Sequence, residues 1–169
     1  MEVEDLVEAF ALATERALRT GFDAIELHGA HGYLLHQFLS PLSNQRDDQY
    51  GGTLENRMRF PLQVFDAVRS AWPDDKPLGM RISATDWIDG GWDLPQSLAL
   101  AHELEQRKCD FLDVSSGGLA DSQKVKAGPG YQVPFAEQIK QQTELAVMTV
   151  GMITEAQQAE SIISNGQAD

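Results

Sequence analysis

The sequence predicts an α/β fold that is part of a (β/α)8 barrel. Four short apolar runs, each the length of a buried strand, recur at residues 24–28, 78–83, 111–115 and 146–151. Segments with helical spacing of apolar residues separate these runs, and such alternation favours a parallel sheet with right-handed crossovers. The last two strand-to-strand intervals, 33 and 35 residues, each match a single βα unit.

The helices are predicted from apolar stripes and from end signals. An apolar stripe over residues 3–19 predicts the first helix, and Gly21 follows it as a C′ residue. Pro95 stands where a first-turn proline is tolerated, and Thr154 is predicted to cap the last helix. The remaining helices are predicted at 56–71, 94–107, 134–142 and 154–164.

A polar insertion, SPLSNQRDDQYGGTLENRMRF, lies between the first strand and the helix at 56–71. Its dense hydrogen-bonding groups predict a loop that bonds to itself, and the alternative is a lid that contacts substrate. Thr53 or Asn56 is expected near the N-cap of the following helix. The side chains concerned are Asn44, Arg46, Asp48, Tyr50, Asn56 and Arg57.

Two architectures fit this order of elements: a small doubly wound sheet, and part of a barrel that normally has ~250 residues. The chain opens on a helix with no strand before it, and it stops at NGQAD, where a strand usually follows. We therefore expect residues 1–169 to be a single incomplete barrel domain that lacks the N-terminal strands and the final strand.

Composition narrows the classes of partner. Asp and Glu total 26 against 13 Lys and Arg, and a formal charge of -13 disfavours nucleic-acid binding. Cys109 is the only cysteine, and we expect it to be a buried small hydrophobe rather than a reactive thiol. The start MEVEDLVEAF lacks a signal-peptide pattern and no apolar run reaches the ~20 residues that span a bilayer, so we expect a cytoplasmic protein with no membrane partner.

Functional groups of parallel α/β proteins gather at the carboxyl ends of the strands. After the first strand, LHGAHGY supplies His28, His31 and Tyr33. Two adjacent imidazoles can donate N–H bonds to a carbonyl or phenolate oxygen, and Tyr33 can supply a proton. A metal site and a purely structural histidine pair are the alternatives, but no third ligand has suitable spacing. His36 falls on the following helix, where packing is expected.

The other strand ends also carry polar groups. Arg81 lies inside the apolar run LGMRIS, where a cation needs an anion or an electron-rich ring. The alternative for Arg81 is a buried ion pair with Asp86 or Asp113. The runs SSGG and VGMIT offer backbone N–H groups suited to phosphate, and the helix after VGMIT adds its N-terminal dipole.

The string ELHGAHGYLLHQFLSPLSNQRDDQYGGTLENRMRF resembles the old yellow enzyme family of flavin-dependent ene-reductases. The similarity continues through MRISATDW, FLDVSSG, PGYQVPFAEQIK and VGMIT. With histidine at position 31, the string resembles the bacterial NADPH dehydrogenase branch of this family, also called thermophilic-like. The resemblance implies a (β/α)8 barrel with FMN at its C-terminal mouth, of which this chain covers approximately strands four to seven.

The resemblance also implies roles for individual residues. His28 and His31 would hold the carbonyl oxygen of an α,β-unsaturated substrate, and Tyr33 would be the proton donor. Arg81 would lie beside the N1–C2 edge of the flavin, where it favours the anionic reduced ring. The full set of implied cofactor contacts is His28, Arg81, Ser115, Gly151 and Met152, and no metal is implied.

The implied activity is reduction of activated C=C bonds by ping-pong hydride transfer, from NADPH or NADH to FMN and then to the enone. The implied partners are a small enone-type molecule and, for the parent protein, further copies of itself. Because flavin contacts are missing from this chain, we expect it to bind FMN poorly alone. The competing hypotheses are a non-catalytic truncated fragment, which includes one that dimerises to restore a closed sheet, and a metal-binding α/β module.

Overall fold

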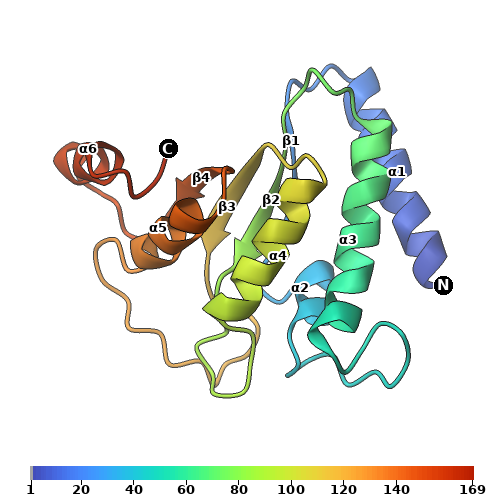
Figure 1. Cartoon of the computed structure of the whole chain (residues 1–169), viewed down its shortest axis with the longest axis horizontal. Helices are drawn as coiled ribbons and strands as arrows, with labels where there is room; N and C mark the ends of the chain where they lie inside the picture. The colour runs from blue at the N-terminus through green and yellow to red at the C-terminus, as the bar shows by residue number, and fades with distance from the viewer. Residues whose placement is uncertain (1) are drawn as a thin grey trace.

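Four parallel strands form one sheet in the order β1-β2-β3-β4 in the computed structural model, which describes residues 2–169 (Figure 1). The strands are β1 (Ile25–Gly29), β2 (Leu78–Ser83), β3 (Phe111–Ser115) and β4 (Ala146–Thr149). Neighbouring strands follow one another in the sequence, so every connection is a crossover of the βαβ type. This is the arrangement expected of consecutive units of a (β/α)8 barrel.

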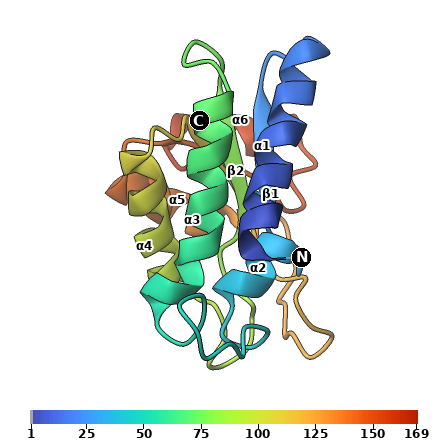
Figure 2. The same ribbon diagram turned by 90° about the vertical axis from the view of Figure 1, so that its right-hand side faces the viewer.

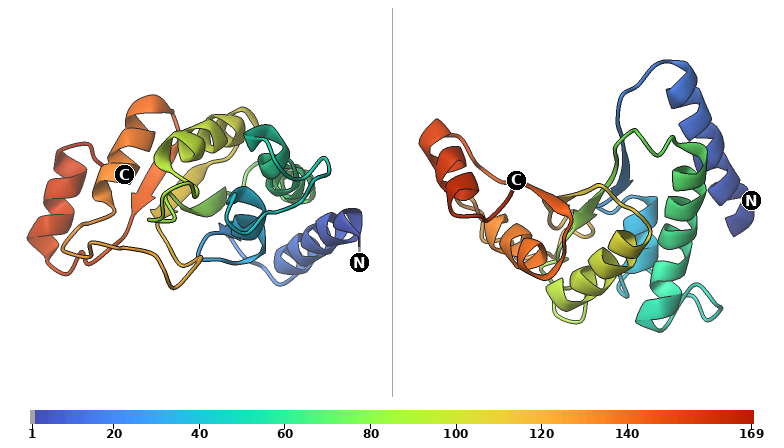
Figure 3. Two further views of the ribbon diagram at one scale, coloured as in Figure 1. Left: turned by 90° about the horizontal axis from the view of Figure 1, so that it is seen from below. Right: turned by 45° about the horizontal axis from the view of Figure 1, so that its top comes forward.

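The helices lie along the outside of the curved sheet. Figure 2 shows α1 and α3 side by side, and the right panel of Figure 3 shows the helices as an arc around the strands. Within residues 2–169, no helix covers the other face of the sheet. The helices are α1 (Val3–Arg19), α2 (Leu34–Leu39), α3 (Leu54–Ala71), α4 (Leu94–Gln106), α5 (Val133–Gln142) and α6 (Ala156–Ser164).

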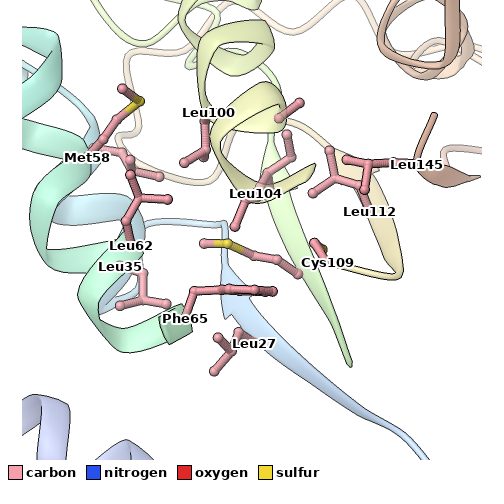
Figure 4. Packing of buried hydrophobic residues seen from close by; sticks show 14 of the residues in the cluster. Leu27, Leu35, Met58, Leu62, Phe65, Leu100, Leu104, Cys109, Leu112 and Leu145 are labelled. Carbon is pink, nitrogen blue, oxygen red and sulfur yellow. The ribbon is translucent and has the colours of Figure 1, made fainter. Parts of the chain in front are cut away.

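The two faces of the sheet differ in chemistry because side chains alternate along each strand. One row, paired in register across all four strands, is buried against the helices: Leu27, Met80, Leu112 and Val147. Figure 4 shows Leu27 and Leu112 in the apolar cluster with Phe65 of α3 and Leu104 of α4. The next row faces the concave side and is mostly polar: His28, Arg81, Asp113 and Met148.

The ends predicted for the strands and helices lie within two residues of the observed ends, and α3 begins at Leu54 rather than at 56. Thr53 caps α3 by accepting from the Asn56 N–H at 3.3 Å, and Gly21 follows α1 with φ of 84°. The strand β4 ends at Thr149 rather than at 151, because Gly151 has a φ of 113°, outside the β region. The prediction that Thr154 caps α6 is wrong: Glu155 is the N-cap residue, and its side chain makes no cap bond.

The polar insertion bonds to itself and to its surroundings, as predicted. The Asn44 Nδ2 group donates to the carbonyls of Phe38 and Tyr50, each at 2.7 Å. Arg57 is buried and donates to carbonyls of Gly52 and Leu39. These bonds hold the loop on the protein surface beside α2 and α3, so the loop has a structural role.

Two further expectations concern burial. Cys109 is buried, and its burial raises the pKa of the thiol to about 12, which confirms the prediction of an unreactive core residue. Among residues 2–169, no helix has both the length and the apolar character needed to cross a membrane.

Candidate functional site

The predicted site residues lie at one edge of the sheet, where the four parallel strands end. His28 of β1 is in register with Arg81 of β2, which is in register with Asp113 of β3. Ser83 and Ser115, two residues further along β2 and β3, are also paired in register. The parallel topology therefore brings residues that are distant in sequence to a common edge on the concave side.

The two histidines and the tyrosine form a cluster. The ring centroids of His28 and His31 are 5.2 Å apart, and those of His28 and Tyr33 are 5.1 Å apart. Tyr33 is 63% exposed, so its hydroxyl is open to a ligand. The two imidazoles lie next to each other, as the sequence predicts, and the phenol of Tyr33 lies beside His28.

His31 is held in a strained conformation by neighbouring strands. Its φ is 57°, in the left-handed region that few residues other than glycine adopt. Its N–H donates to Ser83 Oγ at 3.0 Å, and its ring Nε2 lies 2.7 Å from Ser115 Oγ. Ser83 Oγ in turn donates to the Gly117 carbonyl at 2.8 Å. Two serines therefore fix both the backbone and the ring of His31.

Both histidines of the pair are neutral at physiological pH. Burial, followed by the positive charge of Arg81, lowers the pKa of His31 to about 4. Burial and Arg81 also lower the pKa of His28 below its usual value. A neutral imidazole carries one N–H donor, so each ring can give one hydrogen bond to an oxygen.

Arg81 forms the ion pair that the sequence left as an alternative. Its Nε lies 3.0 Å from Asp113 Oδ2, but neither Nε nor Asp113 Oδ1 makes a hydrogen bond within the described residues 2–169. Burial raises the pKa of Asp113 even though Arg81 opposes this shift. Asp86, the other predicted partner, contacts His36 instead. Arg81 therefore keeps unused donors beside His28.

The expectation that SSGG offers free N–H groups to phosphate is wrong for its two glycines. The Gly117 N–H donates to the Thr85 carbonyl at 2.8 Å, and the Gly118 N–H donates to Gln123 Oε1 at 2.7 Å. These glycines serve close packing: a Cβ on Gly32 would lie 2.6 Å from the Gly118 carbonyl oxygen. The loop after β3 thus abuts the turn that carries His31.

The turn at Gly151 and Met152 fits an anionic group better. Both residues have positive φ, 113° and 54°, and a Cβ on Gly151 would lie 2.8 Å from Gln132 Nε2. The Gly151 carbonyl accepts from the Gly130 N–H at 2.9 Å, whereas within residues 2–169 the N–H groups of Gly151 and Met152 donate to no protein acceptor. Successive free N–H groups of this kind suit phosphate oxygens.

Sequence reasoning missed the polar network behind the site. His36 is fully buried and contacts Asp86 and the Gly32 N–H, although we expected only packing. The available signal was a histidine on the apolar side of a short helix, together with an aspartate just after a buried strand. Ser115 is buried against His31, and its contact with a cofactor stays a prediction.

The described part of the chain, residues 2–169, holds no group of three or more His, Cys, Asp or Glu side chains that could bind a metal ion.

The family model of the NADH:flavin oxidoreductase / NADH oxidase family matches residues 1–169. The chain belongs to this family. Its description agrees with the predicted cofactor class, a flavin that works with a nicotinamide nucleotide.

Curated relatives within the NADH:flavin oxidoreductase family are named NADPH dehydrogenase. The protein of Bacillus subtilis (strain 168) is 46% identical over 168 residues, which are 99% of this chain and 49% of that protein. The protein of Geobacillus sp. (strain WCH70) is 47% identical over 168 residues and is covered to 48%. The chain therefore spans about half the length of the curated relatives it matches.

Solved structures similar to this chain share the fold. A 2-naphthoyl-CoA reductase in complex with 2-naphthoyl-CoA superposes with a TM-score of 0.92 at 28% identity, over 99% of this chain and 26% of that chain. Morphinone reductase in complex with tetrahydroNAD superposes with a TM-score of 0.79 at 32% identity, over 99% of this chain and 44% of that chain. These matches confirm the predicted partial barrel and the resemblance to old yellow enzyme.

Proposed function

We propose that this chain is the substrate-binding half of an FMN-dependent oxidoreductase that reduces activated C=C bonds of α,β-unsaturated carbonyl compounds with NADPH or NADH. The observation that carries the proposal is the cluster of His28, His31 and Tyr33 beside Arg81. Family membership and the NADPH dehydrogenase relatives support it. The whole protein is proposed to contain one barrel domain, of which residues 1–169 are one part, and to form homo-oligomers.

The histidine pair provides the chemistry at the carbonyl. His28 and His31 are neutral because their pKa values are lowered, so each ring carries one N–H. With Ser115 Oγ donating to His31 Nε2, the His31 N–H lies on Nδ1, and both rings can donate to the same oxygen. Negative charge develops on that oxygen when a hydride adds to the β-carbon of an enone. Donors already fixed in position stabilise this charge in the transition state more than they stabilise the bound substrate.

Tyr33 is proposed as the proton donor to the α-carbon. Its ring lies 5.1 Å from that of His28, and the side chain is open to the concave side. A proton delivered at the α-carbon completes the reduction once the β-carbon has received its hydride. An oxygen held by the histidine pair would fix the position of the α-carbon relative to the Tyr33 hydroxyl.

Two features of the chain fit FMN. Arg81 keeps donors free on the concave face, where a planar ring with an electron-rich edge can bind them. The Gly151–Met152 turn offers free N–H groups to a phosphate. When bound, FMN supplies the hydride that reduces the enone. His28, Ser115, Gly151 and Met152 stay proposed contacts of this cofactor, together with Arg81.

The test uses a complete barrel. In the Bacillus subtilis NADPH dehydrogenase, the half that aligns with this chain is replaced by this chain. We call this protein the completed barrel. We expect it to bind FMN and to reduce 2-cyclohexenone with NADPH. We expect His28→Ala to slow this reduction by roughly 10²–10³-fold, the usual effect of losing one oxyanion donor. A folded, FMN-loaded completed barrel that reduces no enone, or a His28→Ala rate equal to wild type, would contradict the proposal.

An experiment on the isolated 169-residue chain distinguishes the proposed function from the hypothesis of a non-catalytic fragment. We propose that the isolated chain binds FMN weakly and shows no steady turnover, because only part of the expected flavin contacts lie on it. Titration with FMN, followed by flavin fluorescence, measures this affinity. Stoichiometric FMN binding with sustained enone reduction by the isolated chain would overturn this part of the proposal.

A further inference from the structure

The strongest unassigned feature is a fully buried hydrogen-bond network beneath the histidine turn. His36 of α2 and Asp86, three residues beyond β2, are both 0% exposed, and His36 Nε2 lies 2.8 Å from Asp86 Oδ1. The other carboxylate oxygen of Asp86 accepts from Ser40 Oγ at 2.6 Å and from the Trp92 N–H at 2.7 Å. Buried ionisable groups with this many partners are retained at a cost in desolvation, so a role is expected.

The network determines which nitrogen of His36 carries the proton. The Gly32 N–H donates to His36 Nδ1 at 2.9 Å, so Nδ1 must be an unprotonated acceptor. The proton therefore lies on Nε2, which donates to Asp86. Burial raises the pKa of Asp86, but the hydrogen bonds from His36, Ser40 and Trp92 outweigh burial and hold it below its usual value. Asp86 is thus an acceptor at neutral pH.

The acceptor on His36 acts on the turn that carries the candidate oxyanion donors. Gly32 follows His31 directly and has a φ of 75°, and Tyr33 comes next as the N-cap of α2. Two consecutive residues with positive φ are costly for a chain that contains a histidine at the first position. The bond from Gly32 N–H to His36 and the bond from His31 N–H to Ser83 hold the amides of this turn. Gln37 Nε2 also donates to the Gly32 carbonyl, at 2.6 Å.

We propose that His36 is a positioning residue: oriented by Asp86 in the Nε2–H tautomer, it holds the His31–Gly32 turn in the geometry that aims His31 and Tyr33 at the substrate. The inference rests on the proposed function for the identity of the substrate. It goes beyond that function because neither His36 nor Asp86 touches the concave face. His36 acts by staying in one tautomer, whose Nδ1 accepts the hydrogen bond of a backbone amide. It does not contact a reacting atom.

Asp86→Asn tests whether Asp86 fixes the tautomer of His36, with almost no change in side-chain volume. Ser40 Oγ and the Trp92 N–H both donate to Oδ2, so the amide oxygen of the new side chain must take that side. Its NH2 group then faces His36 Nε2, which must give up its proton. The proton moves to Nδ1, where it opposes the Gly32 N–H, and the bond to Gly32 is lost.

The first readout needs no substrate. In the 169-residue chain, nitrogen-15 NMR of the imidazoles is expected to show the Nε2–H tautomer of His36, and Asp86→Asn is expected to convert it to Nδ1–H. Hydrogen exchange of the Gly32 amide should then be at least about tenfold faster relative to core amides such as that of Leu112. An unchanged tautomer, or an unchanged Gly32 exchange ratio, would overturn the inference.

The second readout is activity of the completed barrel. We expect Asp86→Asn to lower kcat/KM for 2-cyclohexenone by about tenfold or more, because misplacement of a catalytic group is costly. The rate at which NADPH reduces the bound flavin should stay within twofold of wild type. His36→Asn should retain most of the enone activity, since its Oδ1 can still accept from Gly32, whereas His36→Leu should lose it. Equal activity of these two His36 variants would overturn the positioning role.

A matched control separates positioning from plain loss of stability. Ser97 is also fully buried and accepts from Trp92 Nε1 at 2.7 Å, whereas the bond from Trp92 to Asp86 comes from its main-chain N–H. Ser97→Ala should reduce stability but leave the His36 tautomer and the Gly32 exchange ratio unchanged. The same loss of Gly32 protection in Ser97→Ala would contradict the inference. A wild-type completed barrel that reduces no enone would overturn the proposed function alone, since the NMR experiment would still decide the role of His36.

Discussion

Arg81 and Asp113 face each other across β2 and β3, with Arg81 Nε 3.0 Å from Asp113 Oδ2 and no hydrogen bond between them. The pair lies on the concave face of the sheet, beside His28. Such a contact holds the guanidinium in place by charge while its donors stay available. A planar, electron-rich cofactor edge can therefore bind Arg81 without first breaking an internal hydrogen bond.

Arg81→Ala is expected to weaken FMN binding to the completed barrel by roughly 10–100-fold, because hydrogen bonds to a charged group contribute about 1.5–3 kcal/mol each. Asp113→Asn is the matched control: it removes the carboxylate charge but keeps the cation, so its effect on FMN affinity should be smaller. Flavin fluorescence titration measures both affinities. Equal affinity of wild type and Arg81→Ala would contradict the assignment.

Protonation of His31 should make stability depend on pH. Its pKa is lowered from 6.5 to about 4 in the folded chain, so the unfolded chain binds more protons between these values. Stability therefore falls as the pH decreases from 6.5 towards 4. His31→Asn removes the titrating group and keeps a residue that tolerates positive φ. Urea unfolding at several pH values should show that the variant loses less stability than wild type as the pH falls. Equal losses in the two proteins would contradict the assigned pKa.

Tyr33→Phe should separate the two half-reactions of the completed barrel. Reduction of the flavin by NADPH needs no proton from Tyr33, so its rate is expected to stay near that of wild type. Reoxidation by 2-cyclohexenone should slow by roughly 10²–10⁴-fold, the usual contribution of a general acid. Stopped-flow absorbance of the flavin follows both steps. Equal slowing of the two half-reactions would refute a role confined to proton donation.

Gly151→Ala should reduce both stability and flavin retention. The added methyl group would lie 2.8 Å from Gln132 Nε2 and 2.9 Å from the Tyr131 ring, and the φ of 113° disfavours any side chain. We expect a loss of about 1–3 kcal/mol in the free energy of unfolding. Gly52→Ala is a control, because it also has a positive φ but has no atom within 4 Å of the added group. The two variants should differ in FMN affinity.

The sequence was sufficient for the order of strands and helices, because apolar runs and helical stripes depend on neighbouring residues. It also predicted that His28, His31, Tyr33 and Arg81 lie close together, which follows from the parallel topology; their functional roles stay a prediction. It could not identify His36, because the partner Asp86 lies 50 positions away in a loop with no periodic pattern. The roles of Gly117 and Gly118 were also missed: the N–H partner of Gly117 is Thr85 in another loop, and that of Gly118 is the side chain of Gln123, in a segment with no periodic pattern.

Gly32 and Gly118 are in such close contact that neither can gain a side chain: a Cβ on Gly118 would lie 2.7 Å from the His31 Cα, closer than non-bonded atoms approach. This contact determines which positions of the loop after β3 can be varied in mutagenesis that aims to change substrate preference. Positions 119 to 122 and 124 to 127 are open to randomised libraries, whereas Gln123 should be kept because its Oε1 accepts from the Gly118 N–H. Positions 32, 117 and 118 should be kept constant, since variation there would mostly yield proteins with a displaced His31.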